Sequence, residues 1–202
     1  MSVITPAYTD PIKATPGHRF LIQRSGERVW LEAKEVIAGD VLCVPRPQVT
    51  DGTWEGWDVC DHVGGLTERD GSVGYERTRK SALKVAQVTP ACPEMGTLLG
   101  YFLAEGSVDT KQQVLRFSFD ERRVEYITET VSLLSSLFGY HTPKLRTNGG
   151  CTAVIVSSSV LARLFVSIFG GRKSTERRLP EGWRNFDRET LVALLTAYWR
   201  GD

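Results

Sequence analysis

The chain has 202 residues, of which 41% are hydrophobic and 24% charged, a composition typical of a soluble globular protein with one large domain or two small ones. It contains no run of about 18 apolar residues, the length that a membrane-spanning helix needs. Residues 1–6 lack the basic flank and apolar core of a signal peptide, so we expect a cytoplasmic protein.

The positive charge is concentrated in the C-terminal half. Residues 1–106 contain 11 Lys or Arg and 14 Asp or Glu, a net charge of −3, whereas residues 107–202 contain 14 and 10, a net charge of +4. The second half is therefore the one expected to face a polyanion such as DNA. The four cysteines form no Cys-x-x-Cys pair and predict reduced thiols, with neither a zinc site nor a disulfide framework.

Residues 1–47 have the short strands and turn signals of a small all-β unit. Its strands are predicted at residues 12–14, 18–24, 28–31 and 41–44. Residues 48–93 are expected to be a linker or insertion of uncertain order, because 48–80 are rich in Gly, Asp and charge and show no period of 2 or 3.6.

From Glu94 onward the apolar residues recur at helical spacing, which predicts an amphipathic helix ending near residue 105. The next elements are predicted as a strand, a helix, two strands and a helix, at 114–119, 124–137, 142–146, 152–157 and 160–169. We expect Asp120 to cap the first of these helices and Gly139 to end it. This mixed order predicts an α+β domain over 94–202 and not a doubly wound sheet.

An internal repeat relates residues 98–105 (LLGYFLAE) to residues 195–202 (LTAYWRGD). Small residues recur at every fourth position in both copies, at Gly96, Gly100 and Ala104 and at Ala193, Ala197 and Gly201. Two such helices can pack backbone to backbone, because nothing larger than a methyl group separates them.

An acid ends each copy of the repeat, which predicts that Glu105 and Asp202 lie close together at one end of the paired helices. Two carboxylates there repel each other and also face the negative ends of both helix dipoles. A bound Mg²⁺ resolves both problems, and paired acids holding Mg²⁺ suit the in-line hydrolysis of a phosphodiester.

The two octets resemble the paired LAGLIDADG motifs of homing endonucleases, with 98–106 as the first motif and 195–202 as the second. The resemblance implies an αββαββα half, a saddle of strands that lies in the DNA major groove, and ligation of magnesium by the last acid of each motif. Glu105 and Asp202 would then be the catalytic acids. A buried helix with a glycine stripe would explain one octet alone, but not its second copy.

Basic residues around the repeat are candidates for contacts with double-stranded DNA. Residues 171–180 resemble the basic segment before the second motif in intein endonucleases, and Lys173 is the catalytic candidate there. It could neutralise charge on the phosphorane, hold the backbone, or be a solvated loop cation. Arg116, Lys144 and Arg146, on predicted strands, are candidates for groove contacts.

Residues 14–20 (ATPGHRF) resemble the Thr-x-x-His block of inteins and related Hint folds, and residues 30–42 resemble the strand pair that follows it. The resemblance implies that Thr15 donates a hydrogen bond and His18 transfers a proton when the scissile peptide bond undergoes an acyl shift. Cys43 follows this block, whereas the nucleophile precedes it in the family, so autonomous splicing is not expected.

The sequence therefore predicts a partial Hint segment (1–47), a linker or insertion (48–93) and a LAGLIDADG endonuclease domain (94–202) of an intein, a site-specific and Mg²⁺-dependent double-strand DNA endonuclease. We expect a fragment, which a second polypeptide could complete, or else a relic or a truncated gene product. Two other functions stay open, namely a protein-splicing or autoprocessing half and a non-catalytic LAGLIDADG-type DNA-binding module.

Overall fold

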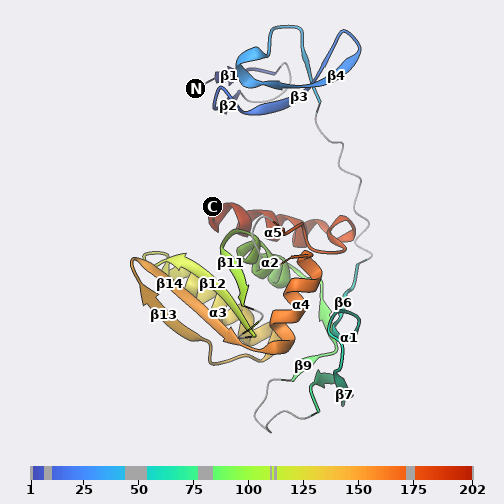
Figure 1. Cartoon of the computed structure of the whole chain (residues 1–202), viewed down its shortest axis with the longest axis vertical. Helices are drawn as coiled ribbons and strands as arrows, with labels where there is room; N and C mark the ends of the chain where they lie inside the picture. Colours follow the sequence, from blue (N-terminus) through green and yellow to red (C-terminus); the bar gives the residue numbers. More distant parts are fainter. Residues whose placement is uncertain are drawn as a thin grey trace. The chain divides into compact units, whose positions relative to one another are not determined.

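The computed structural model describes residues 2–6, 11–43, 54–76, 84–109, 111, 113–171 and 176–201. It divides into two compact units, Met1–Gln48 and Val49–Asp202, which are treated separately below as the N-terminal and C-terminal units (Figure 1). Helices and small antiparallel sheets occur together, so the predicted α+β class is confirmed. In the described part, no helix has the length and apolar character that would let it cross a membrane.

The N-terminal unit consists of short antiparallel strands, as predicted. Its elements are β1 (Ser2–Ile4), β2 (Ile12–Ala14), β3 (Arg19–Arg24), β4 (Glu27–Glu32), the 3-10 turn η1 (Ala33–Glu35) and β5 (Val41–Leu42). The strands β1 and β2 pair with each other, and β3 lies between β4 and β5 in a three-stranded sheet. The tight turn at Ser25 and Gly26, both with positive φ, closes the β3–β4 hairpin.

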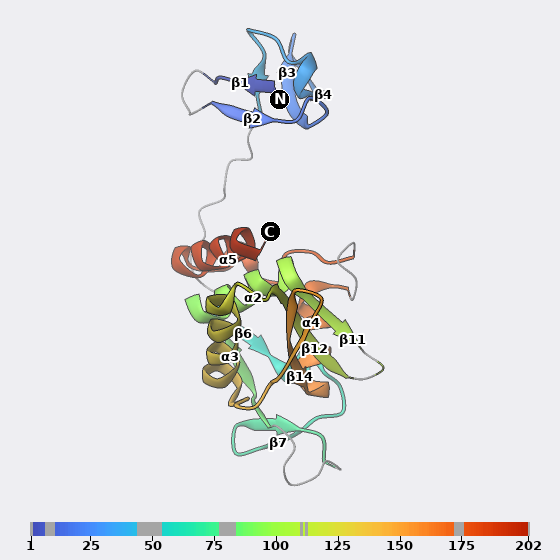
Figure 2. The same ribbon diagram turned by 90° about the vertical axis from the view of Figure 1, so that its left-hand side faces the viewer.

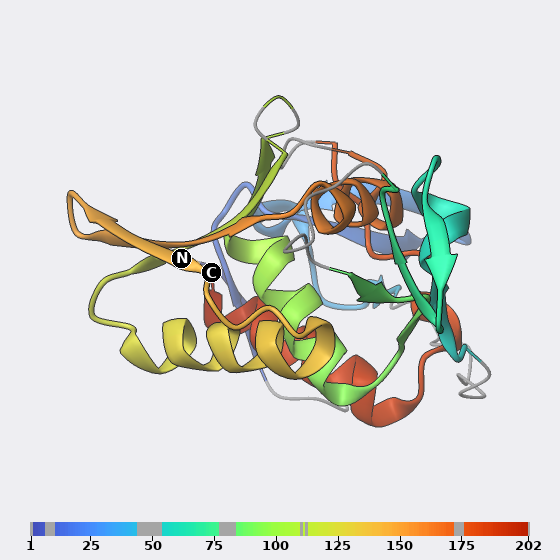
Figure 3. The same ribbon diagram turned by 90° about the horizontal axis from the view of Figure 1, so that it is seen from below.

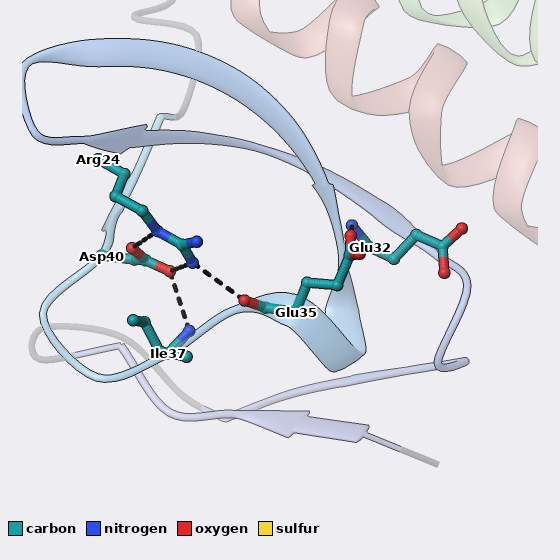
Figure 4. A network of polar contacts seen from close by, with 5 residues as sticks. All are labelled: Arg24, Glu32, Glu35, Ile37 and Asp40. Atoms are coloured by element: carbon teal, nitrogen blue, oxygen red, sulfur yellow. Dashed lines mark hydrogen bonds and ion pairs between the residues drawn. The ribbon is translucent and has the colours of Figure 1, made fainter.

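An ion pair between Arg24 and Asp40 ties the end of β3 to the loop that leads into β5 (Figure 4). The guanidinium donates to both carboxylate oxygens of Asp40, at 2.7 Å each, and to the carbonyl of Glu35 at 3.0 Å. The backbone N–H of Ile37 donates to the same carboxylate at 2.9 Å. Chiefly because of Arg24, and then of the Ile37 amide, the pKa of Asp40 falls to about 2.

This ion pair predicts an acid-dependent weakening of the N-terminal unit. Because the pKa of Asp40 is lower in the folded state, its contribution to stability is complete above the ordinary pKa of 3.8 and is lost as the pH falls towards 2. Asp40→Asn should lower the urea concentration at the midpoint of unfolding at pH 6. The fall of this midpoint between pH 4.5 and pH 2 should be smaller in the variant than in the unmodified protein. NMR signals of β3 and β4 would report the unfolding, with the exposed Glu27→Gln as control; an equal effect of both variants would contradict the assignment.

The C-terminal unit is built around a four-stranded antiparallel sheet in the order β11-β12-β14-β13. Its strands are β11 (Gly106–Asp109), β12 (Val114–Asp120), β13 (Lys144–Asn148) and β14 (Cys151–Ser157). The β13–β14 hairpin turns at Gly149 and Gly150, as predicted. Periodicity did not predict the strand β11, because Gly-Ser-Val-Asp has little strand propensity and pairs only at the edge of the sheet, with β12. The αββαββα order that the resemblance implies does include a strand at this place.

Helices cover one face of this sheet, and α2 and α3 are seen on the same side of it in Figure 3. They are α2 (Pro93–Glu105), α3 (Val124–Phe138) and α4 (Ser159–Phe169). A further helix, α5 (Arg188–Gly201), follows the 3-10 turn η2 (Trp183–Asn185) and packs on α2. Phe117 of β12 contacts the rings of Phe102 in α2 and Phe165 in α4. Phe119, two residues along the strand, contacts Tyr101 of α2 and lies on the same face.

The capping residue of α3 differs from the prediction, although the helix begins at Val124 as expected. Asp120 does not cap the helix, since its carboxylate accepts from the backbone N–H of Arg122 at 2.9 Å and is paired with the side chain of that residue. Arg123 occupies the N-cap position instead. The aspartate instead ends β12 in a turn, an alternative use of a short polar side chain. The predicted end at Gly139 is confirmed, with φ of 63°.

The described residues of the segment before α2, 54–76 and 84–92, form short elements whose apolar side chains pack into the core of the C-terminal unit. They are β6 (Gly56–Asp58), α1 (Val59–His62), β7 (Thr67–Arg69), β8 (Ser72–Gly74), β9 (Val85–Ala86) and β10 (Val88–Pro90). Trp57 is fully buried, with its ring 5.7 Å from that of Phe186. The segment expected to be a linker or insertion of uncertain order thus contains short strands and a one-turn helix in its described residues, which the sequence did not reveal because strands of two or three residues are too short to show a period.

Candidate functional site: the paired helices α2 and α5

The helices α2 and α5 lie side by side, as Figures 1 and 2 show. A Cβ atom on Gly96 would come within 2.5 Å of the carbonyl oxygen of Thr190, and one on Gly100 within 2.8 Å of Cβ of Ala197. Real Cβ atoms do not approach other atoms this closely, so the helices could not keep this separation with larger side chains. The predicted packing of the two small-residue stripes is confirmed.

The same packing brings the ends of the two repeats together. A Cβ atom on Gly201 would lie 2.5 Å from Cβ of Ala104 and 3.4 Å from Cγ of Glu105. Glu105 is half-buried and is the last residue of α2, while Gly201 is the last of α5. The first predicted acid thus lies against the residue that immediately precedes the second. Asp202 itself is outside the described residues, as is Lys173.

Gly106 joins α2 directly to β11 with no residue between them. A Cβ atom at this position would come within 2.6 Å of the ring of Phe102, so a side chain has no room. The N–H of Gly106 donates to the carbonyl of Phe102 and closes the last turn of the helix. Glu105, the last residue of the helix, is therefore followed directly by a strand.

Arg177 reaches this junction from the segment before α5. Its Nη1 donates to the carbonyl of Phe102 at 2.7 Å and its Nη2 to that of Gly106 at 2.6 Å. The guanidinium carbon lies 4.9 Å from the centre of the Phe102 ring. Sequence reasoning noted the basic segment 171–180 but missed this residue, since a cluster of charges without a period does not indicate which cation turns inward.

Tyr101 connects the opposite side of α2 to α3. Its hydroxyl donates to a carboxylate oxygen of Glu129 at 2.5 Å. Burial, followed by the neighbouring Glu129, raises the pKa of Tyr101 well above its usual range, and Arg200 of α5 has a smaller opposing effect. A neutral tyrosine therefore lies one helical turn before Glu105 and contacts both α3 and the last turn of α5.

The three predicted groove residues share one face of the sheet. Arg116 of β12 and Lys144 of β13 are both register partners of Ile155 in β14, and direct partners across a sheet project from the same face. Arg146 lies in the next row, opposite Ala153. This is the face opposite Phe117 and the helices. Lys144 and Arg146 are exposed, whereas Arg116 is half-buried.

In the N-terminal unit, Thr15 and His18 occupy one turn. The backbone N–H of His18 donates to the carbonyl of Thr15 at 3.0 Å, and the His18 ring lies 4.9 Å from that of Phe20. The carbonyl of His18 accepts from the N–H of Ala33 at 2.7 Å, which fixes the turn beside η1. The roles assigned to these two side chains stay predictions.

A metal site at the helix ends would draw on few protein ligands. Nowhere in the described ranges do three or more His, Cys, Asp or Glu side chains gather in a group that could hold an ion. The donor at the junction is the carboxylate of Glu105, and oxygen donors of this kind suit Mg²⁺, which usually keeps several waters and takes only one or two carboxylates. The carboxylate of Glu105 is compatible with one ligand of such an ion, and the second acid of the predicted pair, Asp202, lies outside the described residues.

No protein-family model matches the sequence. The chain is 25% identical over 193 residues to RNA polymerase subunit Rpo1C of Methanocaldococcus jannaschii, covering 95% of the chain and 22% of that protein. In Thermococcus kodakarensis it is 25% identical to the replication factor C small subunit (95% of the chain, 17% of that protein) and 26% identical to the DNA polymerase II large subunit (68% and 8%). The chain thus spans less than a quarter of these archaeal proteins, all named for DNA or RNA synthesis.

The close approach of α2 and α5 predicts that Gly100→Ala is destabilising. The added methyl would overlap Ala197 and the backbone of α5, and overpacking of this kind costs about 1–3 kcal/mol. Urea unfolding followed by tryptophan fluorescence would measure the loss. Gly64→Ala is the matched control, because a Cβ atom there meets nothing within 4 Å; equal stability of both variants would contradict the packing.

Proposed function

We propose that this chain belongs to a Mg²⁺-dependent, double-strand DNA endonuclease of the intein-borne LAGLIDADG type. One observation carries the proposal, namely the contact of Gly201 with Ala104 and Glu105. The acid that ends the first octet lies beside the residue that precedes the acid of the second, on helices whose backbones touch. Two acids brought together in this way suit the hydrolysis of a phosphodiester with a divalent cation.

The identities of the similar proteins support an inserted element. Nearly the whole chain aligns with a minor part of two proteins with different names, an RNA polymerase subunit and a replication factor C subunit, and much of it aligns with a DNA polymerase. A segment shared by such different proteins is expected of an element that inserts into host proteins. The Thr15–His18 turn in the N-terminal β unit agrees with a splicing ancestry for that element.

In this proposal Glu105 and Asp202 hold the cation. When bound, Mg²⁺ supplies Lewis-acid polarisation of the phosphate and lowers the pKa of a coordinated water. Arg116, Lys144 and Arg146 bind the duplex with the exposed face of the sheet, where the cations lie in two neighbouring rows. A second polypeptide would be needed if the target site extends beyond this face, and Lys173 would contribute from the segment before α5.

The proposal predicts that Glu105→Gln abolishes cleavage but not binding. Loss of one ligand charge should lower the cleavage rate by at least about 100-fold, whereas the sheet face is unchanged. Bound duplexes would be selected from a randomised library and sequenced after incubation with MgCl₂, and affinity would be measured by fluorescence anisotropy in CaCl₂.

Glu94→Gln is the matched control, because Glu94 is exposed in the first turn of the same helix. Magnesium-independent binding with no cleavage by any form of the chain would favour the non-catalytic DNA-binding module. Peptide ligation after mixing with a candidate partner, without cleavage of DNA, would favour the protein-splicing half.

The assignment of the sheet face predicts the salt dependence of DNA binding. Lys144→Gln and Arg146→Gln should each weaken binding and reduce the slope of log K against log [salt] by about 1, because each loses one phosphate contact. Arg188→Gln, an exposed arginine of the same unit at the start of α5, should leave the slope unchanged. Equal slopes for all four proteins would place the duplex elsewhere.

A further inference from the structure

The C-terminal end of α2 carries an acid where a helix favours a cation. Glu105 is its last residue, and no basic residue occurs in the last turn. The helix dipole gives this end a partial negative charge that disfavours a carboxylate. A positive group from elsewhere in the chain would offset this charge.

Arg177 supplies such a positive group, and its two strongest hydrogen bonds go to residues on either side of Glu105 in the sequence. It binds the carbonyl of Phe102, which precedes the acid by three residues, and that of Gly106, which follows it. A weaker contact of 3.5 Å reaches the carbonyl of Leu103. One planar group thus joins the last helical turn to the first residue of β11.

The guanidinium is already committed to these partners. Its Nε is buried and has no hydrogen-bond partner among the described residues, so that side is closed to a ligand. Burial lowers the pKa of Arg177, but an arginine remains charged in proteins. A lysine could not replace it fully, because a single ammonium group lacks the rigid fork that spans two carbonyls.

We infer that Arg177 is a positioning residue, which fixes the last turn of α2 and thereby the carboxylate of Glu105, and that it does not contact the scissile phosphate. The effect of Arg177 on metal binding by Glu105 rests on the proposed endonuclease function. The claim that Arg177 fixes the last turn of α2 does not, because these hydrogen bonds form within the chain itself.

Hydrogen exchange of the backbone amides 103–106 tests the structural part. Arg177→Met should speed their exchange about tenfold or more, because it removes charge-assisted hydrogen bonds from the helix end, and Arg177→Lys should have an intermediate effect. Arg178→Met is the control, since Arg178 is its exposed neighbour in the same segment. Unchanged exchange in Arg177→Met would overturn the inference.

A magnesium titration tests the positioning of Glu105. The Mg²⁺ concentration for half-saturation, read from the Gly106 amide shift, should rise several-fold in Arg177→Met, and excess Mg²⁺ should restore the maximal cleavage rate. Faster exchange with an unchanged Mg²⁺ requirement, or a cleavage rate lost at every Mg²⁺ concentration, would overturn the inference. If the unmodified chain neither responds to Mg²⁺ nor cleaves DNA, the proposed function fails, while the exchange experiment still decides whether Arg177 holds α2.

Discussion

The close approach of two helix backbones is the constraint on which the C-terminal unit depends. Gly and Ala occupy the positions where the two helices approach most closely, so main-chain atoms set the spacing of α2 and α5 there. The other side of α2 carries large rings, since Tyr101 and Phe102 pack on the sheet through Phe119 and Phe117. A helix that is bare on one side and aromatic on the other can take only one rotation about its axis, and this rotation determines where Glu105 lies.

This arrangement places the carboxylate of Glu105 at the C-terminal end of α2, where the helix dipole disfavours a negative charge. Surrounding residues offset this unfavourable interaction. Arg177 supplies positive charge at the end of α2, where the helix has no basic residue of its own. Glu129 and Arg200 lie near Tyr101, which burial keeps neutral. A carboxylate at the C-terminus of a helix is disfavoured by the helix dipole, so the position of Glu105 is more consistent with the proposed function than with packing.

Elements whose sequence keeps a helical or strand period over many residues were predictable. Short elements, and contacts between residues far apart in the sequence, were not. The small-residue stripes and the spacing of the octets predicted the helix pair, and the alternation in β12 predicted its buried face. The edge strand β11 is too short and too poor in strand-forming residues to show a period, and β6, which carries Trp57, is stabilised by pairing with β10, far along the sequence. Arg177 could be placed only with coordinates, because 71 residues separate it from Gly106.

The direct junction of α2 and β11 has a mechanical consequence. Since no flexible residue separates the helix from the strand, and Arg177 binds both sides of the junction, a change in the twist of the sheet must tilt the end of the helix. Bending of a ligand held on the cationic face would thus be transmitted through the edge strand to Glu105. Binding of the duplex and positioning of Glu105 would then be coupled. A duplex that fits the sheet face poorly would be bound with Glu105 out of position.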